Sequence, residues 1–137
     1  MNQSQFGLIG RNISYSFSQA YFTEKFKLLG RSDLSYKNYD IQDLNLEFKS
    51  VLTASNIKGL NVTIPYKKAV IPFLDGLDPI AAKIGAVNTI KIQDGKKIGY
   101  NTDAPGFRDS IKKVLPKGSP SALIFGTGGA AQAVAFA

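Results

Sequence analysis

Residues 5–29 read QFGLIGRNISYSFSQAYFTEKFKLL, which is a short apolar run, a polar turn and then a longer amphipathic segment. The apolar run at residues 5–10 predicts a buried strand, and the near-helical spacing of Ala20, Phe22 and Phe26 predicts a helix over residues 18–29. Ser18 is expected to cap that helix. A strand followed by a helix is the repeating unit of parallel α/β sheets, so this stretch sets the fold class.

The same alternation continues along the chain. It predicts strands at residues 35–41, 59–64, 86–93 and 96–100, and helices that start at Asp43, after Pro65, at residue 79 and at residue 103. Asp94 and Gly95 form a two-residue hairpin signal, which makes the sheet mixed. We therefore predict an α/β fold: a three-layer, open, mixed and mostly parallel sheet with helices on both faces.

The last part of the chain is organised differently. Residues 103–114 read as a connecting helix, and residues 116–120 (PKGSP) read as a linker. Residues 122–125 predict an apolar strand that leads into GTGGAA and a small-residue helix, which is the strand-turn-helix that opens a dinucleotide-binding Rossmann domain. We expect a first domain over residues 1–102, a connection over 103–120 and a truncated start of the Rossmann domain over 121–137.

The composition limits the partners of the chain. Its net charge of +7, from 17 Lys and Arg against 10 Asp and Glu, raises the question of nucleic-acid binding, but the basic residues are scattered and never exceed two in a row. We favour a solvated surface whose positive field attracts an anionic metabolite and a phosphate-bearing cofactor. No apolar run or signal-peptide pattern points to a membrane. We expect a cytoplasmic protein with neither nucleic acid nor membrane as a partner.

Cysteine and histidine are both absent. Sulfur redox chemistry and thiolate metal ligation are therefore excluded, and we expect no metal site. Any acid-base step near neutral pH must use a lysine, a carboxylate or a tyrosine.

Serine hydroxyls lie in the turn between the first predicted strand and helix. Ser16 and Ser18 fall in SYSFS at residues 14–18. Ligands of open α/β sheets bind at the carboxyl ends of the strands, and hydroxyls beside a helix N-terminus can hold a carboxylate there. The alternative is that these serines only cap the helix and fill the turn.

The segment NVTIPYK ends the third predicted strand at Lys67. Strand alternation places Asn61 and Thr63 on one face, and Val62 and Ile64 are expected to pack on the other. A lysine held in a partly desolvated cleft can act as a general acid-base group. A solvated surface lysine is the alternative.

Two further polar side chains stand at strand ends, Asn88 in GAVNT and Asp103 in GYNTD. They could converge on the hydroxyl groups of a small polyol. Each could instead form a turn or cap a helix.

These segments together resemble a known family. ISYSFS, NVTIPYK, GAVNT, NTD and GTGGAA occur in the order, and with roughly the separations, of shikimate dehydrogenases. The resemblance implies that Ser16 and Ser18 bind the shikimate carboxylate, and that the ring hydroxyls are surrounded by Asn61, Thr63, Lys67, Asn88 and Asp103. It implies that Lys67 is the acid-base group and Asp103 its partner. It also implies that the NADP pyrophosphate lies against Gly126, Gly128, Gly129 and Ala131.

The resemblance implies a function for the intact parent. It would reduce 3-dehydroshikimate to shikimate with NADPH, a step of chorismate and aromatic amino-acid biosynthesis. Residues 1–102 would bind the substrate, and the chain alone would be inactive because its NADP site is incomplete. The family has a histidine where Tyr15 stands and a proline where Gln19 stands. Residues 122–137 would leave apolar surface and backbone without partners, so we expect either self-association through them or disorder.

Other functions stay open at this point. A quinate or dual-specificity dehydrogenase is the rival within the enzyme class. A non-catalytic polyol-carboxylate binding module is the rival outside it, and a basic nucleic-acid binder comes third.

Overall fold

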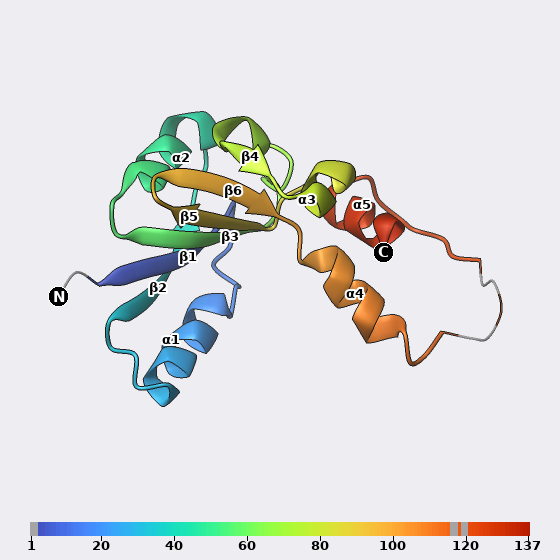
Figure 1. Ribbon diagram of the computed structural model, residues 1–137, viewed down its shortest axis with the longest axis horizontal. Coiled ribbons are helices and arrows are strands. Elements are labelled where there is room, and N and C mark those ends of the chain that lie inside the picture. The colour runs from blue at the N-terminus through green and yellow to red at the C-terminus, as the bar shows by residue number, and fades with distance from the viewer. Residues whose placement is uncertain (1–2, 116–117, 119–120) are drawn as a thin grey trace.

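The computed structural model describes residues 3–115, Gly118 and residues 121–137. The elements follow in the order β1 (Ser4–Gly10), α1 (Ser18–Leu28), β2 (Leu34–Asp40), α2 (Leu44–Thr53), β3 (Ile57–Val62), the 3₁₀ turn η1 (Ile71–Phe73), β4 (Gly76–Leu77), α3 (Pro79–Ile84), β5 (Thr89–Gln93), β6 (Lys96–Tyr100), α4 (Asp103–Ile111) and α5 (Gly129–Phe136). Their arrangement is shown in Figure 1.

The strands form one sheet in the order β2-β1-β3-β5-β6-β4. β1 pairs in parallel with β2 and β3, and β4 pairs in parallel with β6. β5 is antiparallel to both β3 and β6. The predicted mixed sheet is therefore confirmed. Only β4 was not predicted, because its two residues are too few to show alternation in the sequence.

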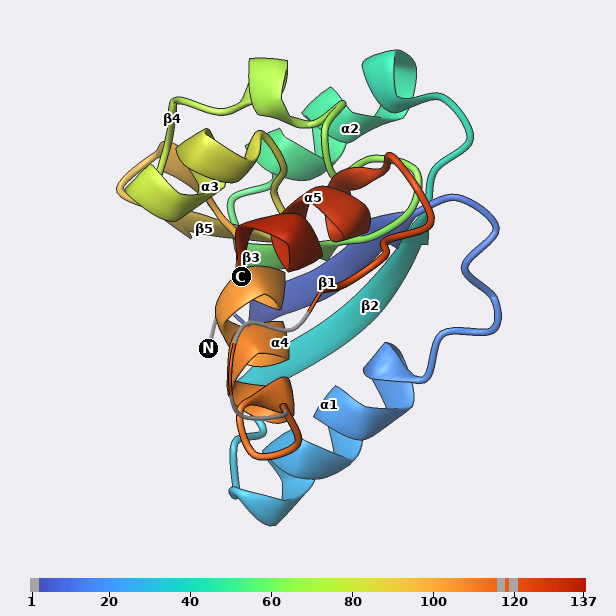
Figure 2. The ribbon, with the colours of Figure 1, turned by 90° about the vertical axis from the view of Figure 1, so that its right-hand side faces the viewer.

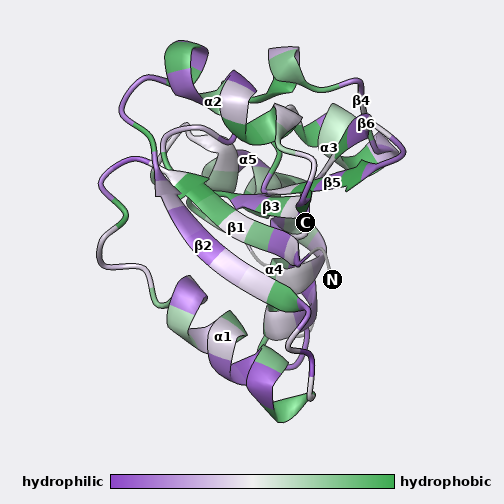
Figure 3. Ribbon diagram, turned by 90° about the vertical axis from the view of Figure 1, so that its left-hand side faces the viewer, coloured by the Kyte–Doolittle hydropathy of each residue, from purple (hydrophilic) through white to green (hydrophobic). Residues whose placement is uncertain are grey.

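Helices cover both faces of the sheet, as predicted (Figure 1). The larger core lies on the face of α2 and α3, where Ile9, Val62 and Ile90 meet Phe48 and Ala81. The other face carries Leu8 and Tyr36, which pack against Phe22 and Phe26 of α1. The edge strand β2 is mostly hydrophilic in Figure 3, as suits a strand that has a neighbour on one side only.

Side chains cap the starts of α2 and α3 but not that of α1. α2 begins just after Asp43, close to the predicted start, and the Asp43 side chain caps it by accepting from the backbone N–H groups of Asn45 and Leu46. Ser18 does not cap α1, and that expectation is wrong. Instead the Ser16 hydroxyl, two residues earlier, accepts from the Ser18 N–H at 3.3 Å.

The hairpin between β5 and β6 sets the position of the site. Asp94 and Gly95 have φ angles of 52° and 76°, the left-handed values that a tight two-residue hairpin turn requires. The hairpin returns the end of β6 to the start of β5, with Tyr100 opposite Thr89. The predicted strand at residues 86–93 begins only at Thr89, so residues 86–88 are loop at this edge of the sheet.

The end of the chain differs from the prediction. Residues 122–125 form no strand, and Leu123 and Phe125 are 78% and 90% exposed. A strand needs a neighbouring backbone to pair with, and no strand of the described residues lies beside this segment. The predicted helix after it does form as α5, while residues 116–117 and 119–120 of the predicted linker lie outside the described residues.

α5 packs against α3 and α4 through a small cluster of Ile84, Ala86, Ala104 and Ala133. Figure 2 shows α5 and α4 together in front of the sheet. Across the described residues no helix is long and apolar enough to span a bilayer.

Candidate active site

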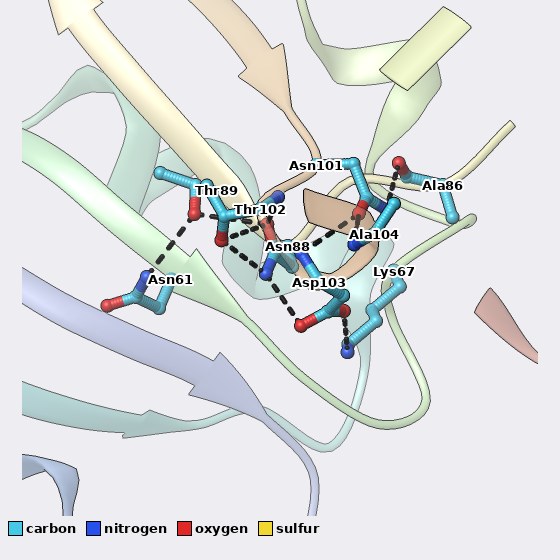
Figure 4. A network of polar contacts seen from close by, with 9 residues as sticks. All are labelled: Asn61, Lys67, Ala86, Asn88, Thr89, Asn101, Thr102, Asp103 and Ala104. Carbon is cyan, nitrogen blue, oxygen red and sulfur yellow. Dashed lines mark hydrogen bonds and ion pairs between the residues drawn. The ribbon is translucent and has the colours of Figure 1, made fainter. Parts of the chain in front are cut away.

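The chain topology brings the predicted polar residues to one edge of the sheet. β1, β3 and β6 all end at this edge and β5 starts there. Lys67 follows β3, Asn88 precedes β5, and Asp103 follows β6. Figure 4 shows these side chains turned toward one another.

Lys67 and Asp103 form an ion pair. The Lys67 Nζ donates to Asp103 Oδ2 at 2.6 Å, although 36 positions separate the two residues. The side chains are 16% and 33% exposed, so the pair is partly desolvated and still open to a ligand. The Lys67 carbonyl accepts from the Val87 N–H at 2.7 Å. This hydrogen bond connects the loop after β3 to the segment before β5.

Asn88 holds the other oxygen of the same carboxylate. Its Nδ2 donates to Asp103 Oδ1 at 2.9 Å, while its Oδ1 accepts from the Thr102 N–H at 2.8 Å. A backbone N–H can only donate and a carboxylate can only accept, so the amide of Asn88 has one orientation. Asp103 is therefore held on both oxygens and at the first residue of α4, where the helix dipole favours its charge.

Asn101 is a residue that the sequence analysis did not select. Asn101 is a polar residue that is almost fully buried, with 4% of its surface exposed. Its Nδ2 donates to the Ala86 carbonyl at 3.0 Å, and its Oδ1 accepts from the N–H groups of Asp103 and Ala104. Asn101 thus fixes the start of α4 and the backbone of Asp103. The NTD segment was a signal for it, but an asparagine after a strand also reads as a turn former.

Asn61 and Thr63 both lie on the strand end that leads to Lys67. The Asn61 side chain points to β2, where its Oδ1 accepts from the Tyr36 hydroxyl at 2.8 Å. Thr63 lies against Gly10, since a Cβ at Gly10 would stand 2.6 Å from Thr63 Cγ2. Ile64 does not pack on the opposite face and is 66% exposed, because β3 has already ended at Val62.

Ser16 and Ser18 lie at the start of α1, at the carboxyl end of β1 as predicted. Both are partly buried, whereas Tyr15 and Phe17, each just before one of the serines, are exposed. No hydrogen bond among the described residues joins either serine to Lys67, Asn88 or Asp103. The structure therefore places the serines at the expected edge without a direct contact to the ion pair.

The glycine-rich turn forms a second compartment beside Lys67. A cleft of about 500 Å³ is bordered by Lys67, Lys68, Ile64 and Pro65 on one side and by residues 125–131 on the other. All four predicted cofactor residues, Gly126, Gly128, Gly129 and Ala131, line it. The Lys68 Nζ donates to the Thr127 carbonyl at 3.1 Å, which joins the two sides.

The chain is similar in sequence to known proteins. The sequence profile of the shikimate dehydrogenase substrate binding domain matches residues 8–90, which is more than half of the chain. The shikimate dehydrogenase (NADP(+)) of Methanosphaera stadtmanae is 44% identical over 133 residues, which are 95% of this chain and 46% of that protein.

Solved structures are similar over nearly the whole chain. Shikimate dehydrogenase 1 from Peptoclostridium difficile superposes with a TM-score of 0.87 at 35% identity, over 97% of this chain and 51% of that one. Shikimate 5-dehydrogenase from Thermus thermophilus, in complex with NADP(H) and shikimate, gives 0.83 at 38% identity, over 98% and 51%. The chain spans about half the length of these proteins. By profile, sequence and fold, it belongs to the family of shikimate dehydrogenase substrate-binding domains.

Proposed function

We propose that the chain is the substrate-binding part of an NADP-dependent shikimate dehydrogenase, which reduces 3-dehydroshikimate to shikimate on the route to chorismate and the aromatic amino acids. The observation that carries the proposal is the Lys67–Asp103 ion pair, 2.6 Å long, at the border of the glycine-rich cleft. A proton donor therefore lies beside the compartment in which a dinucleotide would lie.

The residues supply the proton chemistry of a carbonyl reduction. As a hydride adds to the carbonyl carbon, the C=O π electron pair moves onto the oxygen, which must then take a proton. The Lys67 ammonium stabilises that developing charge and gives up the proton. Asp103 holds the ammonium in place and keeps its charge balanced, and Asn88 keeps Asp103 in place.

The remaining polar residues are proposed to orient the substrate. Asn61, Thr63 and Asn88 would contact the ring hydroxyls together with Lys67 and Asp103. Ser16 and Ser18 would bind the carboxylate at the N-terminus of α1, where unpaired N–H groups favour an anion. This division of roles fixes the ring so that its carbonyl faces Lys67.

The glycine-rich turn fits the pyrophosphate of NADP. The space around Gly128, which precedes α5, is open, since a Cβ there would meet no atom within 4 Å. The first N–H groups of α5 have no intrahelical partner and can donate to phosphate oxygens. Gly126, Gly128, Gly129 and Ala131 would hold the cofactor there, and the bound cofactor would supply the hydride.

We propose a division of the chain that matches this function. Residues 1–102 would form the substrate domain, 103–120 the connection and 121–137 the beginning of the cofactor domain. We include self-association through residues 122–137, because Leu123, Phe125 and Phe136 leave apolar surface exposed. The cytoplasm is the proposed location, as the compartment that supplies NADPH.

A titration of shikimate and quinate into the chain tests the proposal. Shikimate should bind, and Ser16→Ala should weaken its binding about 10-fold through loss of a hydrogen bond to a charged group. Ser14→Ala is the matched control, because Ser14 is exposed in the same turn and should bind as the wild type does.

The same titration separates the rival functions. Quinate carries an additional hydroxyl at the carbon that bears the carboxylate. Equal affinity for the two acids would favour the dual-specificity enzyme. Binding without any NADP-dependent turnover, once the domain is joined to a complete cofactor domain, would favour the binding module. Absence of shikimate binding would contradict the proposed function.

A further inference from the structure

A continuous series of hydrogen bonds runs from Tyr36, on the face of the sheet that α1 covers, to the Lys67–Asp103 ion pair. Tyr36 contacts Asn61 at 2.8 Å, Asn61 contacts Thr89 at 3.5 Å, and Thr89 contacts Asn88 at 3.1 Å. Asn88 then reaches Asp103, and Asp103 reaches Lys67. Figure 4 shows the series from Asn61 to Lys67. It links the edge strand β2 to the acid-base group across the sheet.

The direction of every hydrogen bond in the series follows from its fixed end. The Thr102 N–H must donate to Asn88 Oδ1, and Asp103 must accept from Asn88 Nδ2. The Thr89 hydroxyl therefore donates its single proton to Asn88 Oδ1, and can only accept from Asn61.

The orientation of Asn61 follows in turn. Because the Thr89 oxygen accepts, the group of Asn61 that faces it is the Nδ2 donor, at 3.5 Å. Asn61 Oδ1 consequently points to Tyr36 and accepts from its hydroxyl at 2.8 Å. Thr89 decides which end of the amide faces which partner, because a tyrosine hydroxyl can either donate or accept. The Tyr36 contact, at 2.8 Å, is the shorter and stronger of the two and holds the amide in that orientation.

The Tyr36 hydroxyl is held in place by a buried ring and stays protonated. Its side chain is 6% exposed and its ring stacks on Phe22, with centroids 4.5 Å apart. Burial raises the pKa of the Tyr36 hydroxyl well above its usual value, so the O–H stays protonated at any physiological pH. An aromatic ring so held has little freedom to move its hydroxyl away from Asn61.

We infer that Tyr36 is a positioning residue: its hydrogen bond holds the Asn61 amide with Nδ2 on the side of Thr89. A ligand oxygen that enters beside Thr89 would accept from the second Nδ2 proton. Asn61 then selects an acceptor, such as a ring hydroxyl oxygen, at this point of the site. The inference deepens the proposed function and rests on it for the identity of the ligand. The orientation of Asn61 does not depend on the proposed function.

The chain offers a matched pair of variants. Tyr36→Phe removes the hydroxyl that contacts Asn61. Tyr39→Phe, on the same strand, removes a hydroxyl that donates to Gln5 Oε1 at 2.7 Å, away from the site. Both changes keep the aromatic ring and delete one hydrogen bond from a tyrosine hydroxyl to a side-chain amide. The two variants differ only in the amide that loses its partner, which is Asn61 of the site in one case and Gln5 in the other.

Nuclear magnetic resonance of the side-chain amides tests the orientation without any ligand. We expect Tyr36→Phe to shift or double the Asn61 NH₂ signals and to weaken the cross-peak between the Asn61 amide protons and Thr89. Tyr39→Phe should leave both features as in the wild type. Unchanged Asn61 signals in Tyr36→Phe would overturn the inference, whether or not shikimate binds.

A double-mutant cycle on shikimate binding tests the action through Asn61. Tyr36→Phe should weaken binding roughly 3- to 10-fold, the effect of losing one net hydrogen bond. In the Asn61→Ala background the same change should alter binding less than about 2-fold, because residues that act through one contact are not additive. An undiminished loss in that background would mean that Tyr36 acts by another route and would overturn the inference. Failure of the wild type to bind shikimate would instead count against the proposed function, and the amide signals would still decide the orientation.

Discussion

The backbone of Gly129 lies against the side chain of Lys67. A Cβ at Gly129 would stand 2.8 Å from Lys67 Cβ and 3.1 Å from Ala86 Cβ. Both neighbours are Cβ atoms, which cannot move without the backbone. The glycine therefore sets how closely the glycine-rich turn can approach the lysine.

Gly129→Ala is expected to displace α5. The added methyl group overpacks the contact with Lys67, which costs about 1–3 kcal/mol in packed sites. α5 should move outward, expose Ala133, which is buried at present, and lose hydrogen-exchange protection over residues 129–136. Exchange measured by mass spectrometry on the chain would show the change.

Gly128→Ala is the control for that experiment. Gly128 has an extended backbone with φ −75° and ψ 177°, and a Cβ there would meet no atom within 4 Å. Its α5 protection should match that of the wild type. Equal protection in the Gly129 and Gly128 variants would show that the approach to Lys67 does not hold the helix.

Asn101→Ala is expected to destabilise the domain. The change leaves the Ala86 carbonyl and the N–H groups of Asp103 and Ala104 without their partner, and buried groups left unsatisfied cost about 1–3 kcal/mol. The free energy of unfolding, measured in urea, should fall by that amount. Asn56→Ala removes an exposed asparagine side chain and should change it by under about 0.5 kcal/mol. A similar loss of unfolding free energy in both variants would show that the hydrogen bonds of Asn101 do not stabilise the domain.

Much of the fold was predictable because its signals are local. The apolar runs of β1 and β3, the Asp43 cap and the Asp94-Gly95 turn each specify their element within a few residues. The strand expected at residues 122–125 failed for the opposite reason. Its residues favour a strand, but a strand exists only when another strand pairs with it.

The site residues also differ in whether a local pattern in the sequence identifies them. Lys67, Asn88 and Asp103 could be selected because each follows or precedes a strand end, where parallel sheets gather their ligands. The contact of Tyr36 with Asn61 joins residues 25 positions apart, and the inward turn of Asn101 depends on the Ala86 carbonyl 15 positions away. Such pairs depend on sheet register and loop path, which no local pattern in one sequence specifies.

Lys67→Met is expected to slow the reaction by removing the proposed proton donor while keeping most of the side-chain volume. In a protein that joins this domain to a complete NADP-binding domain, kcat for shikimate oxidation should fall about 10²- to 10⁴-fold, the usual contribution of a positioned acid-base group. Shikimate affinity should change much less, because the contacts proposed for Ser16 and Ser18 with the carboxylate would remain. Steady-state kinetics and a shikimate titration on the same preparation separate the two effects.

Lys49→Met is the matched control, since it removes an exposed ammonium on α2, a helix that contributes no residue to the site. Its kcat should stay within about 3-fold of the wild type, as expected for a lysine that takes no part in proton transfer. A Lys67 variant with a raised KM and an unchanged kcat would make Lys67 a binding residue, since that pattern marks an interaction of equal strength in the ground and transition states. The ion pair with Asp103 would then orient the substrate, and the proton would have to come from another group at this edge of the sheet.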